Sequence, residues 1–85
     1  MLDRANPDVT ERVARIVRRM LDKRAIARAA GPDDDLRDAG LASLDIVNLM
    51  LAVETEFDVK IPEREMTPAN FRSIARIAEL VRGLA

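Results

Sequence analysis

A chain of 85 residues forms at most one domain with a small core, because little surface can be buried at this length. It contains no cysteine and no histidine, so it has no disulfide, no thiol nucleophile and no imidazole base. These absences argue against a stand-alone hydrolase or a zinc protein. Hydrophobic residues make up 48% of the chain and aromatic residues 2%, and the abundance of alanine and arginine favours helices.

Charge is distributed unevenly along the chain. Residues 1–32 carry a net charge of +4, residues 33–66 carry −7 and residues 67–85 carry +2. The acidic centre predicts a basic partner, although ordinary solubilising charge would give the same pattern. The sequence has no apolar run of membrane-spanning length and no signal-peptide pattern at its start. We therefore expect a cytoplasmic protein with no stable membrane insertion and a single domain over residues 1–85, ordered from about 7 to 84.

The first predicted helix begins at Asn6, Pro7 or Asp8, where Asp8 and Glu11 fit a capping box. Apolar residues then recur at helical spacing, at Val9, Val13, Ile16, Val17 and Met20. Four arginines lie off this stripe, at positions 12, 15, 18 and 19. Because no aromatic residues alternate with them, we interpret them as a solvated face rather than a nucleic-acid site. Residues 24–30 either extend this helix or form a separate turn, which Gly31-Pro32 ends.

Residues 33–42 are predicted to form the end of a long loop before the second helix. We expect Leu36 and Leu41 to insert into the core and so to determine the path of this loop. The three consecutive aspartates at 33–35 lack the spacing of a calcium-binding loop, so we interpret them as solvated.

The second predicted helix runs from Ser43 to about Phe57 and has two apolar rows. The core-facing row is Ile46, Leu49, Met50, Val53 and Phe57. The other row is Leu44, Val47 and Leu51. We expect this second row to be exposed beside the acidic residues Asp45, Glu54 and Glu56 and to form a docking surface. The alternative is that the long loop covers it.

The remaining sequence predicts a short connector and two further helical segments. Residues 58–62 are expected to be extended, and Thr67-Pro68 to open a helical turn that ends near Phe71. Ser73 is expected to cap the last helix, whose apolar stripe is Ile74, Ile77, Ala78, Val81 and Leu84. The fold class is therefore all-α, a small four-helix bundle with three long helices, one short helix and a long loop between the first two.

Ser43 is the residue most suited to carry a chemical group. The free N–H groups and the dipole at a helix start favour a phosphate there. The chain offers no histidine, and no lysine lies near Ser43 in sequence, so this serine is a poor nucleophile by itself. It is suited to be the substrate of a modifying enzyme. The alternative is that Ser43 is a plain helix N-cap.

The chain resembles the acyl carrier protein family, which includes peptidyl and aminoacyl carriers. Three elements carry the resemblance, and they cover about residues 9–84: residues 11–17, the Gly40-Leu41-x-Ser43-Leu44-Asp45 motif with Leu36 and Asp38 before it, and Glu54-x-Glu56-Phe57-x-Val59-x-Ile61-Pro62. The resemblance implies 4'-phosphopantetheine on Ser43, with the thiol of this arm holding an acyl or aminoacyl group as a thioester. It also implies a recognition helix that contacts partners through Leu44, Asp45, Val47, Asn48, Leu51 and Glu54.

The implied protein is not an enzyme but a substrate of other enzymes, and it binds no metal. Its implied partners are a phosphopantetheinyl transferase, a ligase that loads the acyl or aminoacyl group, and a downstream synthase or transferase. We expect a monomer that does not bind nucleic acid. The alternatives are a helical interaction module with a carrier-like fold and no arm, and a small DNA-binding domain.

Two positions depart from the family's usual pattern. Ala42 stands where most members have Asp or another polar residue, and Asn48 stands where carriers of fatty-acid synthesis usually have Glu. The net charge of −1 is also far from the strong acidity of those carriers. These departures favour a specialised discrete carrier for a secondary metabolite, a modified lipid or an activated amino acid.

Overall fold

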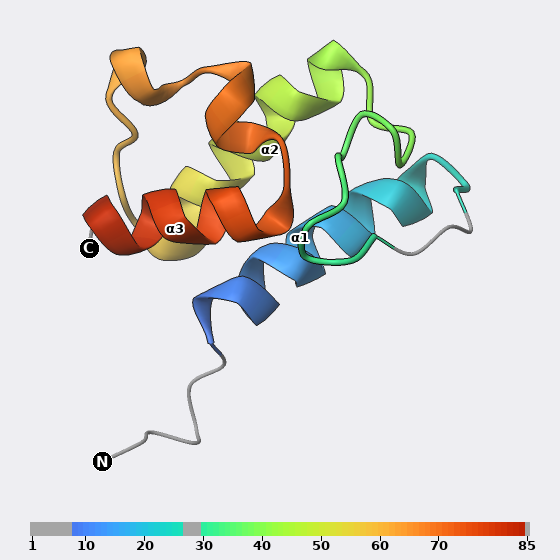
Figure 1. Ribbon diagram of the computed structural model, residues 1–85, viewed down its shortest axis with the longest axis horizontal. Coiled ribbons are helices and arrows are strands. Elements are labelled where there is room, and N and C mark those ends of the chain that lie inside the picture. Colours follow the sequence, from blue (N-terminus) through green and yellow to red (C-terminus); the bar gives the residue numbers. More distant parts are fainter. Residues whose placement is uncertain (1–7, 27–29, 85) are drawn as a thin grey trace.

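The computed structural model describes residues 8–26 and 30–84 (Figure 1). Within these ranges the chain is all-helical and contains no strand. The three long helices are α1 (Val9–Lys23), α2 (Ser43–Phe57) and α3 (Ile74–Leu84), and two short 3-10 helices, η1 (Glu63–Glu65) and η2 (Pro68–Phe71), lie between α2 and α3. The predicted fold class and the long loop between the first two helices are confirmed. No helix in the described ranges is long and apolar enough to cross a membrane.

The start of α1 differs from the expected capping box. Asp8 is the N-cap residue, but its side chain makes no capping hydrogen bond. Its carboxylate instead accepts a hydrogen bond of 3.2 Å from Nη2 of Arg82 in α3, and Glu11 pairs with Arg15. The predicted start at Asp8 is confirmed, but the predicted capping box is wrong, because the carboxylates of Asp8 and Glu11 bind arginine side chains instead. The expected contributions of Asn6 and Pro7 lie outside the described residues.

α1 ends at Lys23 and does not extend toward residue 30. Arg24 is the C-cap and Ala25 takes the left-handed conformation, with φ of 57°. The N–H groups of Ile26 and Ala25 donate to the carbonyls of Leu21 and Asp22, both at 2.9 Å, which is the Schellman pattern that ends a helix. Glycine normally signals this ending, and here alanine takes its place. The alternative of a separate turn within residues 24–30 depends on residues 27–29, which lie outside the described residues.

The core is built from the inner faces of the three helices and from the long loop. Leu36 and Leu41 are both buried, as expected. The loop is held beside the start of α3 because the Leu36 N–H donates to the carbonyl of Arg72 at 2.8 Å and the Ala75 N–H donates to that of Pro32 at 2.9 Å. The core cluster also contains Val13, Ile16, Val17, Leu21, Ile46, Leu49, Met50, Val53, Ile61, Phe71, Ile74, Ile77 and Val81.

One arginine of α1 is not the solvated residue that the sequence predicted. Arg12 is half-buried, and its Nε donates to the Glu56 carboxylate at 2.9 Å. Its guanidinium also lies 4.4 Å from the centre of the Phe57 ring, which is a cation–π distance. Arg12 therefore attaches α1 to the end of α2. The other three arginines, 15, 18 and 19, are exposed, as predicted.

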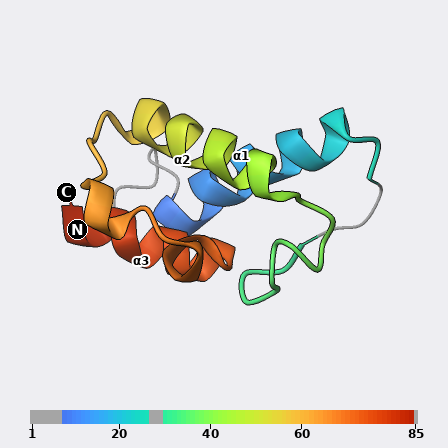
Figure 2. The same ribbon diagram turned by 90° about the horizontal axis from the view of Figure 1, so that it is seen from above.

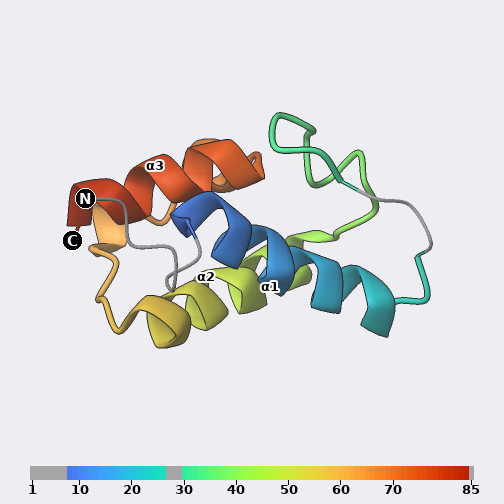
Figure 3. The same ribbon diagram turned by 90° about the horizontal axis from the view of Figure 1, so that it is seen from below.

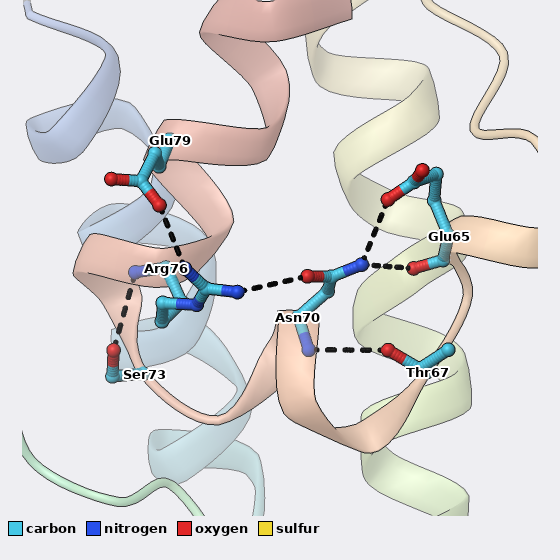
Figure 4. Close-up of polar contacts among 6 residues, drawn as sticks. All are labelled: Glu65, Thr67, Asn70, Ser73, Arg76 and Glu79. Atoms are coloured by element: carbon cyan, nitrogen blue, oxygen red, sulfur yellow. Dashed lines mark hydrogen bonds and ion pairs between the residues drawn. The ribbon is translucent and has the colours of Figure 1, made fainter.

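A polar network joins η1, η2 and the start of α3 (Figure 4). Thr67 and Ser73 act as the expected caps, because their hydroxyl oxygens accept the N–H groups of Asn70 at 3.4 Å and Arg76 at 3.2 Å. The Asn70 side chain donates to the Glu65 carbonyl at 2.8 Å and accepts from Arg76 at 3.2 Å. The short helix η1 was not predicted, since the charged residues 63–65 show no apolar period that would indicate it.

Gly40 occupies a position that a larger residue cannot easily take. Its φ is +119°, a conformation that residues with a side chain rarely adopt. A Cβ placed there would also lie 2.8 Å from Cδ1 of Ile26. Gly40 therefore allows the chain to turn closely over Ile26 just before α2 begins.

We expect Gly40→Ala to lower the free energy of unfolding by about 1–3 kcal/mol, because the methyl group adds both backbone strain and a steric overlap. Urea unfolding followed by far-UV circular dichroism measures this change. The matched control is Gly83→Ala in α3, where a Cβ would meet nothing within 4 Å. Equal stability of the two variants would contradict the assigned role of Gly40.

Candidate functional site

Ser43 is the first residue of α2, and its side chain is exposed. The N-cap is Ala42, which has extended backbone angles, so the alternative that Ser43 is the N-cap is wrong. Among the described residues, no group hydrogen-bonds to the Ser43 hydroxyl. The N–H groups of the first helical turn have no acceptor within the helix, as at any helix start. An exposed, unengaged hydroxyl beside free N–H groups is suited to carry a phosphodiester, so the site fits a phosphopantetheine arm.

Asp45 compensates for the missing polar cap at Ala42. Its Oδ2 accepts the Ala42 N–H at 2.8 Å, which is one half of a capping box. The other half cannot form, because the alanine methyl group offers no acceptor. Asp45 therefore fixes the backbone just before Ser43, and no hydrogen bond joins it to the serine hydroxyl.

Arg24 fixes the Asp45 side chain from the end of α1. The guanidinium donates to Oδ1 from Nε at 3.1 Å and from Nη2 at 2.9 Å, and Nη2 also lies 2.8 Å from Oδ2. The Ala42 N–H and this guanidinium together hold the pKa of Asp45 below its ordinary value, although burial opposes the shift. Sequence reasoning missed Arg24, because a partner 21 positions away leaves no signal in local spacing.

The apolar row on α2 is exposed, as predicted. Leu44, Val47 and Leu51 are 68%, 49% and 54% exposed. They are the large hydrophobic side chains that remain exposed in the described part of the chain. Asn48 is exposed beside them. Patches of this kind on a small protein mark interaction surfaces.

The acidic residues around this row are not the free rim that the sequence suggested. Asp45 is only 8% exposed and is bound to Arg24, so it positions the helix start. Glu54 is half-buried, and its Oε2 accepts the Ile61 N–H at 2.7 Å. Glu56 pairs with Arg12. Each carboxylate thus has a partner within the fold.

The aspartates of the long loop stabilise the loop itself. Asp34 accepts the Gly31 N–H at 2.7 Å, and Asp35 accepts the Arg37 N–H at 2.8 Å. Among the residues that the structure describes, no group of three or more acidic, histidine or cysteine side chains could hold a metal ion.

We expect the contribution of Asp45 to be visible in the pH dependence of stability. The pKa of Asp45 is lower in the folded state than in the unfolded state, so the ionised carboxylate stabilises the fold. This contribution to the free energy of unfolding is complete at pH values above the ordinary pKa of 3.8. It is lost as the pH falls from 3.8 through the folded-state pKa. Asp45→Asn should lower the free energy of unfolding by about 1–2 kcal/mol at neutral pH and should flatten this acid-dependent loss. Urea unfolding at a series of pH values tests this. Asp33→Asn, at an exposed carboxylate of the loop, is the control, and an identical pH profile for both variants would refute the assignment.

Curated relatives of the chain are aminoacyl carrier proteins. The chain is 45% identical over 76 residues to aminoacyl carrier protein 1 of Bradyrhizobium diazoefficiens, covering 89% of this chain and 84% of the relative. It is 42% identical over 74 residues to aminoacyl carrier protein 2 of the same organism, covering 87% and 83%. Both alignments span most of each protein.

Solved structures of similar sequence share the fold. One is from a crystal structure of the Bradyrhizobium japonicum glycine:[carrier protein] ligase complexed with its cognate carrier protein and an analogue of glycyl adenylate. The matched chain has 43% identity and a TM-score of 0.75, with 89% of this chain and 99% of that chain covered. The second contains the same ligase with glycylated carrier protein, and its matched chain has 44% identity and a TM-score of 0.74, with 86% and 99% covered.

Residues 11–81 match the family model described as the phosphopantetheine attachment site. This match includes α2, the exposed Ser43 and most of α1 and α3. The resemblance to carrier proteins is therefore confirmed. The chain belongs to the family of phosphopantetheine-binding carrier proteins, which hold a cargo as a thioester on a 4'-phosphopantetheine arm and are acted on by other enzymes rather than being catalysts.

Proposed function

We propose that this protein is an aminoacyl carrier in which Ser43 bears the phosphopantetheine arm and a ligase loads the arm with a small amino acid, glycine in the first instance. One observation carries the assignment of Ser43. Its hydroxyl is exposed and unengaged at the first position of α2, within the Gly-Leu-x-Ser-Leu-Asp motif of a chain that matches the family. The relatives at 42–45% identity support the aminoacyl cargo, as does the glycylated carrier of the second solved structure.

The role of the protein in this proposal is to present the arm. When bound, the arm supplies the thiol that takes the aminoacyl group from an activated donor. The fold supplies a fixed helix start at Ser43, because Asp45 holds Ala42 and Arg24 holds Asp45. The chain has no histidine or cysteine that could act as base or nucleophile, which agrees with a protein that leaves the chemistry to its partners.

A small polar cargo suits this core. The inner face of α2 and the residues that it covers are buried, with Leu49 and Val53 at 0% exposure and Ile61 and Phe71 at 1%. A long acyl chain sheltered inside would have to displace them, at a cost of a few kcal/mol. A glycyl group needs no such space, so the carrier can remain unchanged between its empty and loaded states.

We further propose that partners dock on the exposed row Leu44, Val47 and Leu51 together with Asn48. The transferase must approach the start of α2 to reach Ser43, and the ligase and the downstream enzyme must come within reach of the arm that is attached there. The row is apolar and adjacent to Ser43, which supports this role. In this proposal Asp45 and Glu54 act inside the fold, because both already have partners there.

Ser43→Ala should abolish the gain of one phosphopantetheine on incubation with coenzyme A and a broad-specificity phosphopantetheinyl transferase. The helical far-UV spectrum should remain, because the side chain is exposed and makes no contact that the fold requires. Intact-mass spectrometry measures the gain. The matched control is the double variant Ala42→Ser with Ser43→Ala, which moves the hydroxyl one residue earlier. Loading of Ser43→Ala would exclude Ser43 as the sole attachment residue, whereas loading of the double variant would show only that the transferase tolerates a hydroxyl one residue earlier.

Leu51→Ala and Leu49→Ala should separate docking from folding on the same helix. Leu49 is 0% exposed, so its truncation should cost about 2–5 kcal/mol of stability. Leu51 is 54% exposed, so its truncation should cost less than about 0.5 kcal/mol but should raise the KM of the carrier for the transferase and the ligase by about threefold or more. Urea unfolding and steady-state loading kinetics measure the two effects. A Leu51→Ala variant with wild-type KM for both enzymes would remove the row from the docking surface.

A further inference from the structure

A groove of about 420 Å³ lies between α1 and α2 and includes the Arg24–Asp45 pair in its lining. The two helices contact each other, and their ribbons cross in Figures 2 and 3. The groove is lined by three residues at the end of α1 and three residues of α2, which are Met20, Lys23, Arg24, Asp45, Asn48 and Ala52.

The groove combines apolar walls with an unbalanced positive charge. Met20 and Ala52 are half-buried. The carboxylate of Asp45 is fully engaged by Arg24 and by the Ala42 N–H. Lys23 is exposed and makes no ion pair among the described residues, and the neighbouring Asn48 is uncharged. The chemistry that fits this groove is an apolar side chain accompanied by a carboxylate.

The position of the groove relative to Ser43 indicates what can occupy it. At 3.6 residues per turn, Ala52 lies about 180° around α2 from Ser43, and Leu51 lies about 80° from it. The exposed row therefore separates Ser43 from the groove. Ser43 and its arm therefore lie on one side of the exposed row, and the groove lies on the other side. A molecule that covers the whole row also reaches the groove.

We propose that the α1–α2 groove is the part of the docking surface that binds the loading ligase, through an apolar side chain and an acidic residue of the ligase that pairs with Lys23. This inference rests on the proposed function. A transferase must bring its active site to the Ser43 hydroxyl itself. A ligase works at the thiol end of a long arm, so its body is free to bind the carrier on the side of α2 that faces away from Ser43. The unbalanced charge of Lys23 then contributes to the choice of partner.

The test uses the phosphopantetheine-loaded chain with the Bradyrhizobium japonicum glycine:[carrier protein] ligase, glycine and ATP. Lys23→Glu reverses the charge, and Ala52→Gln fills the groove with a residue of good helix propensity. We expect each variant to lower kcat/KM for glycylation about tenfold, mainly through a higher KM, as a docking defect requires. Loading by the phosphopantetheinyl transferase should stay within about twofold of wild type.

Arg18→Glu is the matched control, because Arg18 is an exposed cation of α1 that does not line the groove. It should change kcat/KM for glycylation by less than about twofold, and urea unfolding should find all three variants folded. If the wild-type chain is glycylated and the Lys23→Glu and Ala52→Gln variants behave like Arg18→Glu, the groove proposal is wrong. The proposed function then remains intact. A wild-type chain that gains the arm but no glycine contradicts the proposed glycine cargo, and with it the groove proposal.

Discussion

The hydrogen-bonded link from Arg24 through Asp45 to Ala42 is the constraint on which the functional end of this molecule depends. It joins the last turn of α1 to the first turn of α2, and so it fixes both ends of the long loop that connects them. Bringing the ends of such a loop together costs conformational entropy, which a charge-assisted hydrogen bond on a mostly buried carboxylate helps to offset. Because of this link, the helix that carries Ser43 has a fixed start even though its N-cap is an alanine.

The other acidic residues of α2 are likewise bound within the fold. In the linear sequence, Asp45, Glu54 and Glu56 form an acidic border along α2. In the folded protein they bind Arg24, the Ile61 N–H and Arg12 respectively. The three carboxylates that the sequence pattern placed at a partner-binding surface therefore make contacts within the fold. What remains on the outer side of α2 is an apolar row beside a neutral asparagine.

The parts of the fold that were predictable are those governed by local rules. The bounds of α2, the caps at Thr67 and Ser73, and the inward position of Leu36 and Leu41 follow from apolar period, capping chemistry and loop composition, and all are confirmed. The errors arose where a distant residue intervened. The Asp8 carboxylate binds Arg82 instead of capping α1, and Arg12 contacts Glu56 and Phe57 instead of lying in solvent. Arg24 is the member of the site that no local pattern could reveal.

The contact between Asp8 and Arg82 has a practical consequence. It brings residues near the two limits of the described fold to within 3.2 Å of each other, at the start of α1. Ser43 follows the loop that leaves the other end of α1, and a helix of 15 residues is about 22 Å long. The anchoring points for any tether and the point of cargo attachment are thus at opposite ends of one helix. A carrier fixed to a surface, or fused to a neighbour near either limit, would keep its loading end free to move toward a partner.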